Sequence, residues 1–202
     1  MKDFRTDKLP TSPIGWLDHL NRAMKASKGK INQQPASLED TLDQAGRLFK
    51  TAIKDQTSIW WVGNGGSAAI CSHLAQDVMN KLGVKSVFLG EASLLTCMAN
   101  DFGYEQVYAR PLKRMAEKND VLIAISSSGN SENIISSVKL ARDIEMKVIT
   151  LSGMDETNML WSLESDVSIY LDSNLYGIVE VGHEAILHGI VETLWLKLFS
   201  RQ

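Results

Sequence analysis

Short apolar runs alternate with longer amphipathic segments from Ser58 to the end of the chain. Parallel strands need helical crossovers, so this order predicts an α/β fold with a doubly wound, five-stranded parallel sheet. The last helical segment runs from about residue 177 to residue 199. The runs that predict buried strands are 58–62, 85–89, 121–126, 147–151 and 167–171.

An N-terminal helical arm precedes the predicted sheet. Residues 1–11 read as a loose tail, and Ser12-Pro13 predicts the start of a helix that runs to about residue 28. Residues 28–35 are rich in Gly, Asn, Gln and Pro and are typical of a linker. A second helix is predicted from Ser37. We therefore expect two parts, an N-terminal tail and helix over residues 1–36 and the sheet domain over residues 37–202.

Both N-terminal helices are amphipathic, so each needs a surface to cover. That surface is either the core of their own chain or that of another subunit, and we favour the second.

Composition narrows the class of protein. The chain has 202 residues, 44% of them hydrophobic and 22% charged, which is typical of a globular domain. A net charge of -3 argues against nucleic-acid binding. Because no apolar run has the length of a membrane span and the N-terminus is polar, we expect a cytoplasmic protein with no membrane contact. Cys71 and Cys97 are expected to be reduced thiols without chemistry.

The first predicted strand ends in a glycine-rich turn, Gly63-Asn64-Gly65-Gly66-Ser67, and a helical segment follows. Glycines let a ligand approach the backbone closely, and the amides at the start of a helix favour an anion. Asn64 and Ser67 add polar side chains to this turn. The alternative is a tight strand-to-helix turn that binds nothing.

The third predicted strand ends in a similar way, in Ser126-Ser127-Ser128-Gly129-Asn130-Ser131. Hydroxyls beside a helix N-terminus are suited to a phosphate group. Neither loop contains a lysine, an arginine or the Gly-Lys-Ser/Thr ending of a nucleotide P-loop. The pattern therefore favours a sugar monophosphate over a nucleoside triphosphate, bound at the carboxyl ends of the strands.

Histidines and carboxylates cluster on two predicted helices. His73 and Asp77 share one face of the first helix of the sheet domain, because they are four residues apart. The last helix carries Glu180, His183, Glu184 and His188. This clustering suits either general acid–base catalysis or a metal site.

The sequence resembles the sugar isomerase (SIS) domain family, and most closely its phosphoheptose isomerases, also called sedoheptulose 7-phosphate isomerases. The resemblance covers about residues 37–199. The segments that carry it, in order, are Gly63-Asn64-Gly65-Gly66-Ser67, Ala99-Asn100-Asp101-Phe102-Gly103, Ile125-Ser126-Ser127-Ser128-Gly129-Asn130-Ser131 and Met146-Lys147-Val148-Ile149-Thr150-Leu151-Ser152-Gly153.

The resemblance implies a flavodoxin-like sheet and a homotetramer with active sites between subunits. It also implies an aldose–ketose isomerase of heptose biosynthesis, which interconverts sedoheptulose 7-phosphate and D-glycero-D-manno-heptose 7-phosphate through an enediol. Asp77 falls at the position of the family's base, and His188 at that of its acid. Zinc or another divalent metal would be held by His73, Asp77, Glu180 and His188.

The resemblance also implies the residues that bind the substrate. The phosphate would lie against Ser126, Ser127, Ser128 and Ser131. The sugar would lie against Asn64, Gly65, Gly66, Ser67, Asn100, Asp101 and Glu180.

Four residues, in three segments of the chain, differ from the family pattern. Gln76-Asp77 stands where the family has Glu-Glu, so the base is one methylene shorter. Glu180 replaces a glutamine, and a carboxylate binds a divalent metal more strongly than an amide does. Ala68 stands where family members often have histidine. His183 matches a family histidine that we place behind the site.

Two other functions stay open. One is a non-catalytic SIS tetramer that binds a sugar phosphate or a protein partner such as a replication initiator. The other is a different phosphosugar isomerase on the same scaffold.

Overall fold

The structure is a computed structural model that describes residues 10–199. Most of the tail predicted over residues 1–11 lies outside this range. The helical elements are α1 (Pro13–Lys25), α2 (Leu38–Asp55), α3 (Gly66–Leu82), α4 (Ala92–Phe102), η1 (Tyr104–Gln106), α5 (Ala109–Met115), α6 (Glu132–Asp143), α7 (Met159–Ser162) and α8 (Tyr176–Phe199). The strands are β1 (Lys28–Ile31), β2 (Gln34–Ala36), β3 (Ile59–Gly63), β4 (Ser86–Phe88), β5 (Val121–Ser126), β6 (Lys147–Gly153) and β7 (Val167–Leu171).

Within the described residues the strands form one seven-stranded sheet, in the order β2-β1-β7-β6-β5-β3-β4. The five predicted strands are its parallel part. The chain runs from β3 outward to the edge strand β4 and then returns to β5 on the other side of β3. The strand order therefore reverses between β3 and β5, and the crevice at such a reversal is where open α/β sheets bind ligands.

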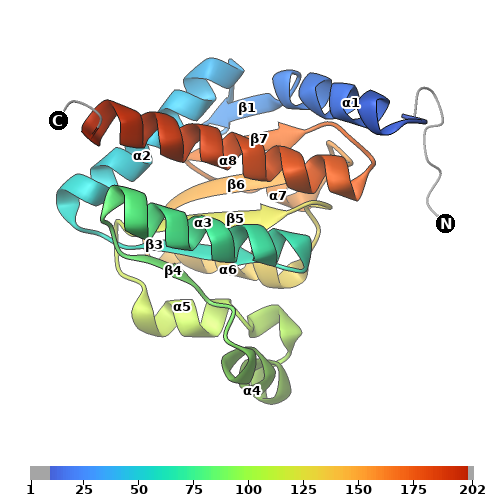
Figure 1. The fold of residues 1–202 in the computed structure, drawn as a ribbon. Coiled ribbons are helices and arrows are strands. Elements are labelled where there is room, and N and C mark those ends of the chain that lie inside the picture. Colours follow the sequence, from blue (N-terminus) through green and yellow to red (C-terminus); the bar gives the residue numbers. More distant parts are fainter. Residues whose placement is uncertain (1–9, 200–202) are drawn as a thin grey trace.

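Helices cover both faces of the sheet, which confirms the doubly wound fold (Figure 1). Adjacent strand residues point to opposite faces. Trp61 packs in a core with α2, α3 and α8, whereas Trp60 packs in a second core with α5 and α6. Both residues are buried, so β3 reads as a continuous apolar run.

The predicted linker over residues 28–35 is wrong. These residues form an antiparallel hairpin, and its first strand, β1, pairs with β7 and extends the sheet. Asn32 and Gln33 make the turn with φ of 48° and 66°. Pro35 lies on β2, the outer strand, where its missing N–H costs no sheet hydrogen bond.

The N-terminal helices begin where their caps predict. The Ser12 and Ser37 hydroxyls accept hydrogen bonds from the amides of Gly15 and Asp40. Helix α2 covers the core of its own chain through residues such as Phe49. Helix α1 packs on α8, yet Ile14 stays 69% exposed.

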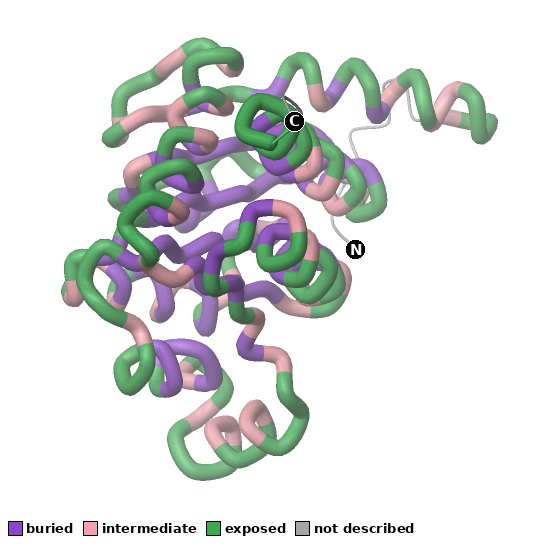
Figure 2. The backbone as a smooth tube through the Cα atoms, turned by 60° about the vertical axis from the view of Figure 1, so that its left-hand side comes forward, coloured by how far each residue is buried: buried purple, intermediate pink, exposed green. Residues whose placement is uncertain are grey.

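Two helical segments differ from the predicted pattern. The amphipathic pattern over residues 104–116 predicts one helix, but these residues divide into η1 and α5, and α7 was not expected. Helix α4 carries no buried residue within the described part of the chain, and Figure 2 shows it at the periphery of the domain. No helix among residues 10–199 has both the length and the apolar character needed to span a membrane.

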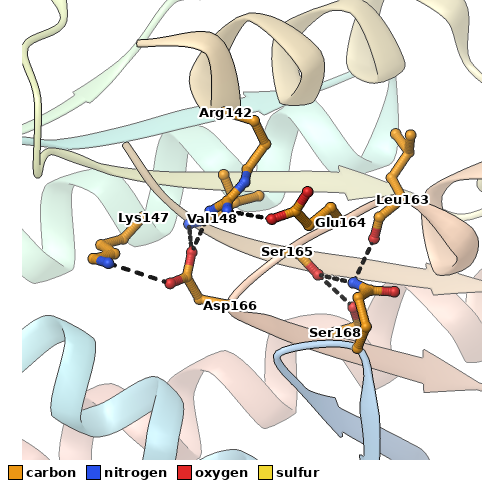
Figure 3. A network of polar contacts seen from close by, with 9 residues as sticks. Arg142, Lys147, Val148, Leu163, Glu164, Ser165, Asp166 and Ser168 are labelled. Atoms are coloured by element: carbon orange, nitrogen blue, oxygen red, sulfur yellow. Dashed lines mark hydrogen bonds and ion pairs between the residues drawn. The ribbon is translucent and has the colours of Figure 1, made fainter. Parts of the chain in front are cut away.

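A polar network braces the amino ends of β6 and β7 (Figure 3). Asp166 accepts hydrogen bonds from Arg142 Nη1 and from the amide of Val148, and pairs with Lys147 at 3.5 Å. Gln33 ties the β1–β2 turn to the carbonyl of Leu163. This network lies at the end of the sheet opposite the strand-order crevice, so its role is structural.

Candidate functional site

A small polar pocket lies at the carboxyl ends of β3 and β5. Its volume is ≈ 130 Å³. Sites that enclose a whole ligand are typically about 300–1,000 Å³, so this pocket suits one polar group of a larger molecule. Its lining residues are Asn64, Ser67, Ile125, Ser126, Ser127, Ser128, Ser131, Tyr176 and Glu180.

Both predicted binding loops contribute hydroxyls to this pocket. Ser126 Oγ and Ser131 Oγ are 3.1 Å apart, and Ser67 Oγ lies 3.5 Å from Ser127 Oγ. Ser131 is the N-cap of α6, and Ser67 lies in the first turn of α3. Two helix N-termini therefore point at one cluster of hydroxyls, an arrangement that favours an anion.

The side chain of Asn64 is held by two residues that the sequence pattern did not reveal. Asn64 and Asn133 exchange amide hydrogen bonds of 2.9 Å and 2.8 Å. The Tyr104 hydroxyl donates a further bond of 3.1 Å to Asn64 Oδ1. These contacts fix the orientation of the Asn64 amide before any ligand arrives.

The carboxylate of Glu180 lies directly over Gly66. A Cβ built on Gly66 would stand 2.5 Å from both oxygens of Glu180, so the close approach requires glycine at this position. Gly65, beside it, has φ of 53° and ψ of −122°, a conformation that suits only glycine. The N-terminal dipole of α3 stabilises the negative charge that Glu180 brings into the pocket.

His73, Asp77 and His188 form a second cluster, between α3 and α8. Their ligand atoms all lie within 4.8 Å of one another. The rings of His73 and His188 are 5.2 Å apart, and His188 Nδ1 lies 3.7 Å from Asp77 Oδ2. Glu180 is not part of this group in the structure, although it lies on the same helix as His188.

Lys81 adds a cation beside this cluster. Its ammonium donates to Asp77 Oδ2 at 3.0 Å and to Glu192 Oε1 at 2.7 Å. Burial raises the pKa of Asp77, but the hydrogen bond and charge of Lys81, together with His73 and His188, outweigh it and hold the pKa below its usual value. Asp77 is therefore ionised at neutral pH and can accept a proton.

His183 is fully buried on α8, where its ring faces β6. Its Nε2 lies 3.0 Å from the carbonyl of Ser152, which makes it the donor nitrogen of a neutral ring. Its Nδ1 has no hydrogen-bond partner among the described residues. Burial lowers the pKa of His183 to about 4.

The structure brings the predicted loops and helices together but leaves two predicted residues apart. Asn100 and Asp101 are exposed on α4, hydrogen-bonded to each other, and do not line the pocket. Their contact with the sugar stays a prediction. Tyr176, which does line the pocket, was missed because it stands one residue before the predicted start of the last helix.

The histidine cluster fits a divalent metal. Two imidazoles and one carboxylate make a donor set suited to zinc, with a position left for substrate. Atoms bound at about 2.1 Å to a tetrahedral ion lie about 3.4 Å from one another, so these three groups, whose atoms lie within 4.8 Å, would have to draw closer together to bind one ion.

Comparison with known proteins places the chain in a family. The model of the SIS domain matches residues 24–153. The chain therefore belongs to the SIS domain family, and its similarity to known proteins supports a sugar phosphate isomerase.

Individual relatives narrow this class. A phosphoheptose isomerase of Helicobacter pylori (strain ATCC 700392 / 26695) is 33% identical over 179 residues, which cover 85% of this chain and 92% of the relative. One of Aliarcobacter butzleri is 32% identical over 164 residues, covering 78% and 86%. The structure of a phosphoheptose isomerase from Neisseria gonorrhoeae superposes with a TM-score of 0.77 at 27% identity, covering 90% and 93%. Within its family the chain groups with these phosphoheptose isomerases, which are aldose–ketose isomerases.

Proposed function

We propose that this protein interconverts sedoheptulose 7-phosphate and D-glycero-D-manno-heptose 7-phosphate, in heptose biosynthesis. The observation that carries the proposal is the pair formed by Asp77 and His188, whose facing atoms are 3.7 Å apart. A carboxylate and an imidazole at this distance can serve one substrate as base and acid. The Ser126–Ser131 loop supplies the phosphate site that such a substrate needs.

The reaction moves one proton between neighbouring carbons. Asp77 removes a proton from C1 of the ketose, which gives an enediol, and returns it to C2 to form the aldose. His188 passes a proton between the two oxygens, so that the C2 carbonyl becomes a hydroxyl as the C1 hydroxyl becomes a carbonyl. Atoms balance without an added reductant or oxidant.

A divalent metal is the cofactor that His73, Asp77 and His188 would hold, with Glu180 as the fourth ligand expected from the family. When bound, such an ion would polarise the substrate carbonyl as a Lewis acid. For Glu180 to contact it, the carboxylate would have to leave its place above Gly66.

The spacing of the two clusters supports a long sugar. Ser67 and His73 are six residues apart on α3, which is about 9 Å along the helix axis. The six carbon–carbon bonds from C1 to C7 of a heptose, each about 1.5 Å, span roughly 8 Å when extended. A heptose with its phosphate in the serine loop therefore extends along α3 to the level of His73, the member of the histidine cluster nearest the loop.

We also propose a homotetramer with active sites between subunits, located in the cytoplasm. An apolar groove of ≈ 880 Å³ lies between α1, α2 and α8, with Met24, Leu42 and Ile190 in its lining. Exposed Trp195 and Leu198 continue the apolar surface along α8. A second copy of the chain would bury this surface, and His73 is exposed enough to face a neighbour. Light scattering coupled to size exclusion should give four chains.

Proton NMR of the purified protein with sedoheptulose 7-phosphate tests the activity. The aldose anomeric signal should appear with wild-type protein and be lost in Asp77→Asn and in His188→Ala. Parallel samples with added zinc and with a chelator report whether the metal is required. If folded wild-type protein gives no aldose signal in any sample, the proposal is contradicted and a non-catalytic binding role is favoured. Turnover of a different phosphosugar would reassign the substrate.

A further inference from the structure

Lys81 donates a hydrogen bond to the same carboxylate oxygen of Asp77 that faces His188. Asp77 Oδ2 is the atom 3.7 Å from His188 Nδ1, and the same atom accepts the 3.0 Å hydrogen bond from Lys81. Asp77 and Lys81 are four residues apart on α3, so they face the same side of the helix. The Asp77 side chain is only 14% exposed, which limits screening of this pair by water.

The Lys81 ammonium and a metal ion would compete for this oxygen of Asp77. Both are cations, and a divalent ion bound by Asp77, His73 and His188 would lie close to the Lys81 charge. Coulomb repulsion between cations a few ångströms apart in a partly buried site is substantial. Lys81 must therefore move away from Asp77 when the metal binds, or weaken the metal by remaining.

The Glu192 carboxylate is a second ion-pair partner for Lys81. Its Oε1 accepts the 2.7 Å hydrogen bond from Lys81, shorter than the one to Asp77, and it lies on α8 one turn beyond His188. The Glu192 side chain is 52% exposed and contacts Lys81 from outside the cluster. An ammonium held by Glu192 alone would leave Asp77 Oδ2 free for the ion.

We propose that Lys81 is a built-in competitor for the metal at the His73–Asp77–His188 group, and that Glu192 sets how strongly it competes by binding the displaced ammonium. The inference rests on the proposed metal site and goes beyond it, because it assigns two residues that would not contact the ion. The group would then have a lower affinity for zinc than its three ligands alone would give.

Zinc affinity of four proteins tests this inference: wild type, Lys81→Met, Glu192→Gln and the double variant. Competition with a chromophoric chelator gives each dissociation constant, and Co²⁺ absorption reports the ligand set. Methionine keeps the helix propensity and most of the apolar stem of lysine. Lys81→Met should tighten zinc binding about tenfold or more. Glu192→Gln should weaken it about threefold or more, because Lys81 then pairs with Asp77 alone.

The double variant separates competition from a general charge effect. If Glu192 acts through Lys81, the Glu192→Gln change should alter zinc affinity by less than about twofold once Lys81 is methionine. Equal effects of Glu192→Gln in both backgrounds would contradict an action of Glu192 through Lys81. Unchanged zinc affinity in Lys81→Met would contradict competition between Lys81 and the metal.

His188→Ala tests the metal site itself. Binding that survives His188→Ala, or no zinc or cobalt binding by any variant, would overturn the site and the inference together. Binding that is lost in His188→Ala but unaffected by Lys81→Met would overturn the inference alone. Circular dichroism and thermal melts establish that each variant is folded.

Discussion

Asp77 and His188 lie on different helices, 111 residues apart in sequence, yet Oδ2 of one approaches Nδ1 of the other to 3.7 Å. The contact depends on α3 and α8 running side by side in front of the sheet (Figure 1). The same pair of helices places Glu180 over Gly66 and Glu192 beside Lys81. One helix–helix contact therefore brings together the proposed base, the proposed acid and their charged neighbours.

Turnover should require a carboxylate at position 77 but should depend less on the length of the side chain that carries it. Asp77→Asn removes the proton acceptor and should lower kcat about 10²- to 10⁴-fold. Asp77→Glu restores the side chain seen in the family and should keep kcat within about tenfold of wild type. Steady-state kinetics with sedoheptulose 7-phosphate measure both variants, and equal losses in the two would show that Asp77 supports the fold rather than the chemistry.

Loss of one serine hydroxyl should weaken binding more than turnover. Ser131→Ala removes a hydroxyl that lies 3.1 Å from Ser126 Oγ in the proposed phosphate site. A hydrogen bond to a charged group is worth about 1.5–3 kcal/mol, so KM should rise about tenfold or more while kcat changes little. A matched substitution, Ser93→Ala on exposed α4, should leave KM unchanged. A fall in kcat with constant KM would place the serine elsewhere in the mechanism.

Neighbouring glycines should respond differently to alanine. At Gly66 the added Cβ displaces the flexible Glu180 carboxylate, so stability should change by less than about 1 kcal/mol while KM rises several-fold. At Gly65 a Cβ meets no atom within 4 Å of the described chain, but φ of 53° with ψ of −122° costs about 1–3 kcal/mol for a side chain. Urea unfolding measures the stability of both variants, and steady-state kinetics measure their KM. A larger stability loss in Gly66→Ala than in Gly65→Ala would contradict this prediction.

Stability should fall in mild acid because of His183. Its pKa is lowered from 6.5 to about 4, so below pH 6.5 the unfolded chain binds this proton more readily than the folded one. The free energy of unfolding therefore decreases as pH falls from 6.5 to 4, by about 3 kcal/mol in all from this group.

Urea denaturation between pH 7.5 and pH 4.5 measures this effect in His183→Gln against wild type. The variant should be less stable at neutral pH and lose less on acidification. His19→Gln, which replaces a partly exposed histidine on α1, is the control and should keep the wild-type slope. An identical slope in His183→Gln would show that another group carries the acid sensitivity.

The parallel strands and both loops could be predicted because local sequence decides them. Residues 121–125 are all apolar because β5 is buried on both faces, and the serines begin where that strand reaches the pocket. The hairpin over residues 28–36 could not, because it pairs through backbone atoms at the sheet edge and places few apolar side chains inward. Its turn also uses Asn32-Gln33 in place of the Asn-Gly that signals a tight hairpin.

The candidate site was predictable in part, for a similar reason. The spacing of His73 and Asp77 is visible within one helix, as is that of Asp77 and Lys81. Contacts between helices, such as Lys81 with Glu192 or Glu180 with Gly66, depend on how α3 and α8 align and leave no pattern in sequence. The same is true of Tyr104, which reaches Asn64 from a different layer of the fold.

Solvent deuterium incorporation tests the central claim most directly. Wild-type protein incubated with sedoheptulose 7-phosphate in D2O should place deuterium on the carbons between which Asp77 moves the proton, as product forms and as substrate returns. In Asp77→Asn, with its fold established by circular dichroism, both incorporation and isomerisation should fall together by about 10²-fold or more. Incorporation at the wild-type rate in that variant would contradict the assignment of Asp77 as the base.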